Sequence, residues 1–381
     1  MAYIIKTGGT ATKWLTIRDA DWPTGVVVRS CGYVKLLRPH VQNPNGIGVD
    51  IREGAHHVAV IDGHIHNCGT DADDAYGGVA IRTCQGAEHD CQVRIQGNAI
   101  YRCEGAGVNA EGEIHDDGRF YYLKGVRIID NSILAITQRP NEGPSNRRTG
   151  VGIQGTTIRT SQITGNYVSD CSMTCIHLDC GTREGLPPIG PSRYIHIEGN
   201  RCWNAGQQLI ELEGAAYCRV LRNLLMGGAG LTHGYANAIL LVTYAKKNQV
   251  AYNIVTNEMG GYTGPLVNIR EQATANTIEH NTLVAIGQPS IVLGDDANDT
   301  AATKNTVIRS NILGYLRLEC ARGAGYVEDY NCFISTMPAV GHGAYDFEAD
   351  PQFVDAAHYD YHLAPGSPCI GAGHGGNIGA L

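Results

Sequence analysis

The sequence predicts an all-β solenoid, a parallel β-helix, because one hexapeptide recurs along it and alternating segments lie between the copies. The hexapeptide has the form apolar-x-x-Asn-x-apolar, and its asparagines follow one another at intervals of 20 to 35 residues. Repeats of this period are typical of solenoids, in which each unit buries its apolar face by stacking on the next. The repeated asparagines are Asn98, Asn131, Asn166, Asn200, Asn223, Asn253, Asn281 and Asn311, with a weaker copy at Asn331.

The segments between the asparagines alternate apolar and polar residues, as in Val79-Ala-Ile81-Arg and Ile210-Glu-Leu212-Glu. Such alternation predicts short strands with one buried face and one outward face. Asn200 and Asn223 are only 23 residues apart, so crossover helices do not fit and successive copies must stack in parallel through turns. Because parallel crossovers are nearly always right-handed, we predict a right-handed parallel β-helix of about eleven coils.

The asparagine column is predicted to be structural. Each amide can hydrogen-bond to the asparagines of the coils above and below and to the turn backbone. Asparagine also tolerates the left-handed backbone that we expect at such corners.

The repeat runs through most of the chain, so one domain is predicted over residues 1–381. Residues 1–45 contain weaker coils, and residues 345–381 form a closing segment. The thirteen cysteines are odd in number and follow no disulfide or zinc spacing, which favours reduced cysteines in the core.

The composition argues against several classes of partner. The net charge of −8 is dispersed, and no basic run with interleaved aromatics predicts nucleic-acid binding. No apolar run reaches the roughly 20 residues that a membrane-spanning helix needs. The first residues lack the layout of a signal peptide. We therefore expect a cytoplasmic protein, a secreted protein whose signal has been removed, or a phage-encoded one.

The chain ends resemble those of a known superfamily. The C-terminal residues Asp350-Pro-Gln-Phe353, Tyr361-His-Leu363 and Pro365-Gly-Ser-Pro368 resemble the closing signature of right-handed parallel β-helix proteins of the pectate-lyase-like superfamily. The N-terminal Lys6-Thr-Gly-Gly-Thr10 is similar to the first coil of the same group. Lyases, including many polysaccharide lyases, hydrolases, epimerases and phage proteins share this signature, so the resemblance implies the fold and does not fix a substrate.

The outward strand positions form two columns when the repeats are aligned. The first is predicted to contain Asp50, Ala80, Asn109, Gly152, His177, Glu211, Leu240, Asn268, Val292 and Arg317. The second is predicted to contain Arg52, Arg82, Glu111, Gln154, Asp179, Glu213, Val242, Arg270, Gly294 and Glu319. This alignment predicts that His177, Asp179, Glu211 and Glu213 share two adjacent rungs. Stacked carboxylates repel one another, which indicates a bound cation or a raised pKa.

Two chemistries fit this cluster. In the first, Asp179, Glu211 and Glu213 hold Ca²⁺, which prefers oxygen ligands, and the ion neutralises a uronate so that a base can start β-elimination. The candidate bases are His177, Tyr244, Lys246 and Arg270. In the second, the carboxylates act as the acid and base of an inverting glycoside hydrolase. A solvated strand face would also account for them.

Other residues could form the walls of a groove for an acidic sugar chain. They are Arg82, Glu111, Gln154, Arg148, His233 and Tyr235. The alternative of a different class is a non-catalytic glycan-binding β-helix, such as a phage tail-spike body or an adhesin. The protein would then be a monomer or a homotrimer.

Overall fold

The structure is a computed structural model, and it describes most of the chain. The described residues are 2–69, 77–83, 88–114, 120–138, 150–180, 192–227, 236–257, 264–285, 288–294, 303–314, 316–318, 325–335 and 342–381. They group into two units, Met1–His196 and Ile197–Leu381. The prediction of a single domain stays a prediction.

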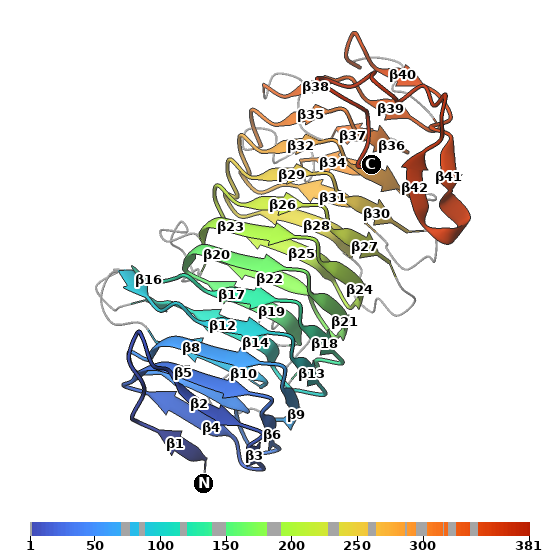
Figure 1. Ribbon diagram of the computed structural model, residues 1–381. Coiled ribbons are helices and arrows are strands. Elements are labelled where there is room, and N and C mark those ends of the chain that lie inside the picture. The colour runs from blue at the N-terminus through green and yellow to red at the C-terminus, as the bar shows by residue number, and fades with distance from the viewer. Residues whose placement is uncertain are drawn as a thin grey trace. The chain divides into compact units, whose positions relative to one another are not determined.

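The first unit contains three parallel sheets that the chain visits in turn, one strand at a time (Figure 1). Its first sheet contains β1 (Tyr3–Ile5), β4 (Val26–Arg29), β7 (Val49–Arg52), β10 (Val79–Arg82), β14 (Ala106–Glu111), β19 (Val151–Thr156) and β22 (Ile176–Asp179). Its second sheet contains β2 (Leu15–Arg18), β5 (Gly32–Leu37), β8 (His56–Ile61), β12 (Arg94–Gln96), β17 (Arg127–Ile129) and β20 (Ile158–Thr164). Its third sheet contains β3 (Asp21–Trp22), β6 (His40–Asn43), β9 (His64–Cys68), β13 (Ala99–Tyr101), β18 (Ser132–Leu134) and β21 (Tyr167–Cys171).

Three further strands of this unit lie off the main path. They are β11 (Glu88–Asp90), β15 (Glu113–Ile114) and β16 (Phe120–Lys124), and β16 pairs with β20 of the second sheet. Strand β23 (Arg193–Glu198) contains the boundary between the two units.

The second unit repeats the same three-sheet pattern. The strands of its first sheet are β25 (Gln208–Glu213), β28 (Asn237–Val242), β31 (Val267–Ile269), β34 (Ile291–Leu293) and β37 (Leu316–Leu318). Those of its second sheet are β26 (Arg219–Leu221), β29 (Gln249–Ala251), β32 (Thr277–Glu279), β35 (Val307–Arg309) and β38 (Val327–Asp329). Those of its third sheet are β24 (Arg201–Ala205), β27 (Leu224–Met226), β30 (Ile254–Thr256), β33 (Thr282–Val284), β36 (Ile312–Leu313), β39 (Cys332–Phe333) and β40 (Phe347–Glu348).

The interior of each unit is filled by the inward residues of the alternating segments. Ile81, Val108 and Ile176 in the first unit, and Ile210 and Leu241 in the second, are at most 1% exposed. The eleven described cysteines are free, and all of them except Cys31 are buried. No helix among the described residues is long and apolar enough to cross a lipid bilayer. The right-handed parallel β-helix is therefore confirmed as the fold.

The predicted asparagine ladder is present in both units. In the first unit, the Nδ2 of Asn98 donates to Asn131 Oδ1 at 3.0 Å, and the Nδ2 of Asn131 donates to Asn166 Oδ1 at 3.0 Å. In the second unit, the same contact links Asn200, Asn223, Asn253, Asn281, Asn311 and Asn331 at 2.9 to 3.1 Å. These side chains are at most 2% exposed, so each amide replaces its water contacts with protein contacts.

The expected left-handed backbone occurs one residue earlier than predicted. The residue before each ladder asparagine has a positive φ, for example 52° at Asp130 and 51° at His280, whereas the ladder asparagines do not. This bend lets the asparagine side chain reach the backbone of the preceding residues. For example, the Nδ2 of Asn281 donates to the carbonyl of Glu279, two residues earlier, at 3.0 Å. The asparagine is therefore required for its amide and not for its backbone freedom.

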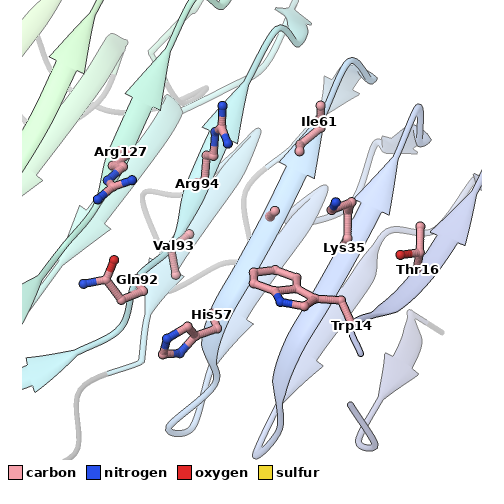
Figure 2. A pocket seen from close by; sticks show the side chains of 10 residues that line it. Trp14, Thr16, Lys35, His57, Ile61, Gln92, Val93, Arg94 and Arg127 are labelled. Atoms are coloured by element: carbon pink, nitrogen blue, oxygen red, sulfur yellow. The ribbon is translucent and has the colours of Figure 1, made fainter. Parts of the chain in front are cut away.

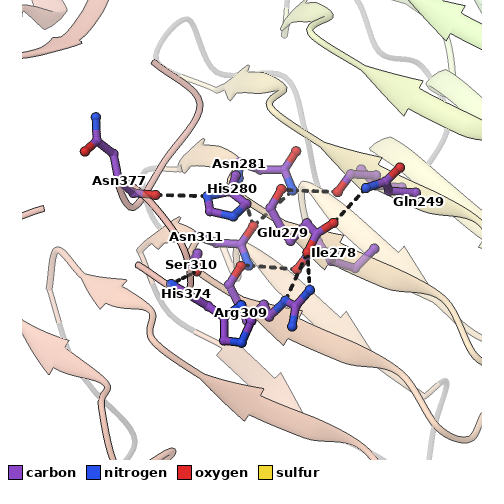
Figure 3. Close-up of polar contacts among 11 residues, drawn as sticks. Gln249, Ile278, Glu279, His280, Asn281, Arg309, Ser310, Asn311, His374 and Asn377 are labelled. Carbon is purple, nitrogen blue, oxygen red and sulfur yellow. Dashed lines mark hydrogen bonds and ion pairs between the residues drawn. The ribbon is translucent and has the colours of Figure 1, made fainter. Parts of the chain in front are cut away.

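The last residues fold back over the end of the second unit. The hairpin β41 (Phe353–Asp355) and β42 (Asp360–Leu363) includes the short 3-10 helix η1 (Ala356–His358). Cys369 and Ile378 pack in one buried cluster with Ile312 and Cys332. Figure 3 shows His280 bound to the carbonyl of Asn377 at 2.9 Å, beside the ion pair of Arg309 with Glu279 at 2.8 Å. The closing segment thus covers the final coils with both apolar and polar contacts.

Candidate functional site

The outward face of the first sheet carries buried polar residues in the first unit. Neighbouring strands place Asn109 opposite Gln154 and Gln154 opposite His177. All three alternate with inward core residues, so they lie on the outward face. They are nevertheless almost fully buried, His177 at 1% exposure and Gln154 at 4%.

A second outward column runs beside the first. Glu111 lies opposite Thr156, and Thr156 lies opposite Asp179, which is 4% exposed. The predicted residues Glu111, Gln154, His177 and Asp179 are therefore brought together on three adjacent strands. Asn109 and Thr156 belong to the same face and were missing from the predicted site.

The predicted register of β19 is wrong by two residues. The alignment paired Val108 with Val151, whereas the structure pairs Val108 with Ile153. Gln154 therefore occupies the first column, where Gly152 was expected. Thr156 occupies the position in the second column where Gln154 was expected. The cause is Gly155, which occupies an inward position opposite Ala110 and Leu178 where the pattern requires an aliphatic residue. A Cβ at Gly155 would lie 2.6 Å from the Cδ1 of Ile158, so Ile158 fills the space instead.

Arg82, predicted to bind substrate, lies in an ion pair. Its guanidinium donates from Nε and Nη2 to the two carboxylate oxygens of Asp50 at 3.1 and 3.0 Å. Asp50 is 4% exposed and also lies 3.4 Å from Arg52. Much of the charge of Arg82 is therefore neutralised within the protein, and its role toward a substrate stays a prediction.

The second unit carries the other predicted carboxylates. Glu211 and Glu213 are two residues apart on β25 and share its outward face, with Glu211 1% exposed. Leu240 and Val242 of β28 lie opposite them. Arg270 follows β31, and its Nε lies 3.8 Å from the carboxylate of Glu271. Glu213 and Arg270 thus belong to one column, about two strand spacings of ~4.8 Å apart.

Two further candidate bases lie in the turn that follows β28. Tyr244 has a φ of 65° and is 39% exposed, and its backbone N–H donates to the carbonyl of Glu271. Lys246 is exposed, and its backbone forms isolated parallel β-bridges with Ala216 and Thr274. Both side chains are therefore at the edge of the first sheet and not on its outward face.

The predicted cluster of His177, Asp179, Glu211 and Glu213 is divided between the two units, two residues in each. Each pair occupies the outward face of its own strand, as predicted. Their joint action stays a prediction. Arg148, His233 and Tyr235 lie outside the described residues.

Comparison with known proteins finds matches among solved structures. No protein-family model matches the chain, and no curated sequence is similar to it. An alginate lyase of the PL6 family, AlyGC, superposes with a TM-score of 0.62 at 14% identity, over 92% of this chain and 49% of that one. The periplasmic alginate epimerase AlgG superposes with a TM-score of 0.52 at 12% identity, over 82% of this chain and 70% of that one.

These likenesses concern the architecture. The chain spans about half the length of the alginate lyase that it matches. At identities of 12% and 14%, superposition shows shared coils and carries no residue roles. The protein shares the right-handed parallel β-helix fold with these two structures.

Proposed function

We propose that the protein cleaves an acidic polysaccharide by β-elimination on the outward face of the first sheet. The observation that carries the proposal is the burial of ionisable residues on the side of the strands that points away from the core. His177 and Asp179 in the first unit and Glu211 in the second are 1%, 4% and 1% exposed.

Burial of such groups costs free energy unless hydrogen bonds or opposite charges compensate it. A strand face that only needed solvation would leave carboxylates in water. Asn109 Oδ1 and Gln154 Oε1, beside His177, are also buried and have no hydrogen-bond partner among the described residues. A site that binds sugar hydroxyls and a carboxylate would supply such contacts.

The fold relatives support the choice of substrate. The two structures described above are named as an alginate lyase and an alginate epimerase. Alginate is a chain of uronic acids, and β-elimination in such a chain begins with removal of the proton next to a uronate carboxylate. An acidic polysaccharide is therefore the substrate class that we propose for this chain.

The proposed reaction needs a base, an acid and a positive charge. The base takes the proton on the carbon next to the carboxylate, the glycosidic C–O bond on the following carbon breaks, and a C=C bond forms between the two carbons. The departing oxygen takes a proton. We assign the base to His177, since histidine is the side chain that most often serves as a general base. Arg270 would stabilise the negative charge, and the departing oxygen would take its proton from water or from Tyr244 or Lys246 at the edge of the sheet.

Calcium is part of the proposal. In the second unit, Glu211 and Glu213 would supply ligands to the ion, since hard carboxylate oxygens are the ligands that Ca²⁺ prefers. The donor set fits, because Glu211 and Glu213 share one strand face and Glu211 is buried. When bound, the ion would neutralise the uronate carboxylate and so acidify the adjacent C–H.

The test is to incubate the protein with alginate, polygalacturonate and glycosaminoglycans and to follow the ultraviolet absorbance of unsaturated uronates. We expect absorbance with at least one of them, abolished by chelator and restored by Ca²⁺. His177→Gln should lower the rate by about 100-fold or more, the usual contribution of a positioned base. Glu213→Gln should raise the Ca²⁺ concentration that half-restores activity.

Glu53→Gln is the matched control, since Glu53 is an exposed carboxylate paired with Arg29. It should leave the rate unchanged. Reducing ends released without new absorbance would show that the protein hydrolyses the polymer and does not act by elimination. Absence of any product on all of these polymers would refute the enzymatic proposal.

A further inference from the structure

A groove lies on the second sheet of the first unit, away from the residues assigned to catalysis, which are on the first sheet. It has a volume of about 470 Å³ and crosses β2, β5, β8, β12 and β17. Figure 2 shows the side chains of Trp14, Lys35, His57, Arg94 and Arg127 along it.

Three cations of the groove lie in one outward column. The strand register runs from Thr16 to Lys35, Ala59, Arg94 and Arg127, each opposite the next. Because successive strands are ~4.8 Å apart, the positive charges form a row along the coil axis. Ala59 is the smallest member of the row and lines the groove between Lys35 and Arg94.

The charge of this row is not balanced among the described residues. Within the part of the chain that the structure describes, no ion pair joins Lys35, Arg94 or Arg127 to an acidic residue. Both arginines are exposed. Arg94 and Arg127 are direct neighbours across two strands, an arrangement that costs free energy for like charges. The carboxylate of Asp90, near the groove, accepts a hydrogen bond from the Gln92 amide at 2.7 Å. A bound anion would remove the repulsion.

An aromatic wall lies beside the cations. The ring of Trp14 is 5.8 Å from that of Tyr33, which is 4.6 Å from that of His57. The Lys35 ammonium lies 5.8 Å from the centre of the Trp14 ring. Burial, aided by the neighbouring His56, lowers the pKa of His57, so its imidazole is neutral at neutral pH and does not add to the positive charge.

We propose that this groove is a second, non-catalytic binding site for an acidic polysaccharide, which it holds along the coil axis. Guanidinium groups bind carboxylates with two parallel hydrogen bonds, and a flat aromatic face accepts the C–H side of a sugar ring. A row of cations beside aromatic rings therefore matches a chain that alternates sugar rings with carboxylates. Gln92 and Thr16 would form hydrogen bonds with hydroxyl groups of the sugar chain. The choice of ligand rests on the proposed function.

The test measures binding of polyuronates to the full chain in the presence of chelator, by calorimetry or affinity electrophoresis. We compare wild type, Arg94→Gln with Arg127→Gln, and Trp14→Ala. The paired control, Arg102→Gln with Arg201→Gln, removes the same charge from exposed arginines outside the groove. The groove variants should weaken binding by about tenfold or more, since charged hydrogen bonds are worth roughly 1.5–3 kcal/mol each. The control should bind within about twofold of wild type, because it loses the same net charge as the groove variant but keeps every groove residue.

The outcomes separate this inference from the proposed catalysis. Unchanged binding in both groove variants would overturn the inference, even if wild type cleaves the polymer. Lost binding in the groove variants would uphold it, even if wild type yields no unsaturated product. Equal loss in the groove and control variants would reduce the effect to net charge and overturn it. Equally tight, groove-dependent binding of single-stranded DNA would overturn the assignment to sugar chains. Circular dichroism and a melting curve of each variant exclude misfolding.

Discussion

Replacing Asn253 by alanine would remove one complete rung of the ladder. Its Nδ2 donates to the carbonyls of Val220 and Ala251 and to Asn281 Oδ1, at 2.9 to 3.1 Å. Its Oδ1 accepts from the backbone and side-chain nitrogens of Asn223, at 3.0 and 2.9 Å. The side chain is 0% exposed, so water cannot take its place without opening the turn.

The cost can be worked out group by group. The side-chain amide of Asn223 keeps a bond to the carbonyl of Ile197, but its backbone N–H loses its acceptor, at about 1–3 kcal/mol. The carbonyl of Val220 loses one donor, which costs less because a carbonyl has two acceptor positions. We expect Asn253→Ala to lower the free energy of unfolding by about 2–4 kcal/mol.

The measurement is urea denaturation followed by far-ultraviolet circular dichroism, with the slope checked for a change in cooperativity. Asn45→Ala, at an exposed turn residue, is the matched control and should stay within about 0.5 kcal/mol of wild type. Polysaccharide binding per folded molecule should be unchanged, since the ladder faces neither candidate site. A change of less than about 0.5 kcal/mol in Asn253→Ala would refute the structural role of the ladder. Lost binding at full stability would refute it as well.

Two other predictions concern single side chains. Burial and the nearby Asp346 raise the pKa of Glu328 to about 9, so the folded protein retains a proton that the unfolded chain releases above its ordinary pKa. Stability should therefore fall as the pH rises from about 5 to 9, by at most about 1.4 kcal/mol per pH unit for this one group. Glu328→Gln should flatten that slope in urea titrations at pH 5, 7 and 9, and an unchanged slope would contradict the assignment. Gly155→Val should destabilise by about 1–3 kcal/mol through overpacking against Ile158. Ile158→Ala should relieve part of that cost in a double-mutant cycle, and strict additivity would show that the two side chains do not compete for one space.

The fold could be predicted from the sequence because its constraint is local and repeated. Each ladder asparagine lies in the same short context, so nine copies report one geometry independently. The alternation of segments such as Ile210-Glu-Leu212-Glu fixes which side chains point inward. A shift of two residues leaves this assignment unchanged, since the side-chain period of a strand is two. The error at β19 therefore altered which rung neighbours Gln154 meets, and not which face it occupies.

The candidate site was harder to predict because loops and packing exceptions decide it. Gly155 breaks the aliphatic pattern, and its partner Ile158 belongs to the next strand, β20, so only the three-dimensional structure shows that one replaces the other.

A second ladder contact was also missed. The Nδ2 of Asn248 donates to Asn276 Oδ1 at 3.1 Å, but neither residue lies in the hexapeptide. Its signal was a spacing of 28 residues between two asparagines, each before an x-apolar strand, too short a series to stand out.

The groove of Lys35, Arg94 and Arg127 left a trace in the sequence that the asparagine alignment could have revealed. Arg94 and Arg127 each precede the isoleucine that opens a hexapeptide, so the same ladder that sets the core register also stacks the two arginines. Lys35 and Trp14 lie in coils without a ladder asparagine, where the register comes only from strand pairing. In a solenoid, any polar residue that recurs at one repeat position becomes a row at strand spacing. Charge that recurs without a matching opposite charge is therefore the feature to search for, on every sheet and not only on the one that carries the buried carboxylates.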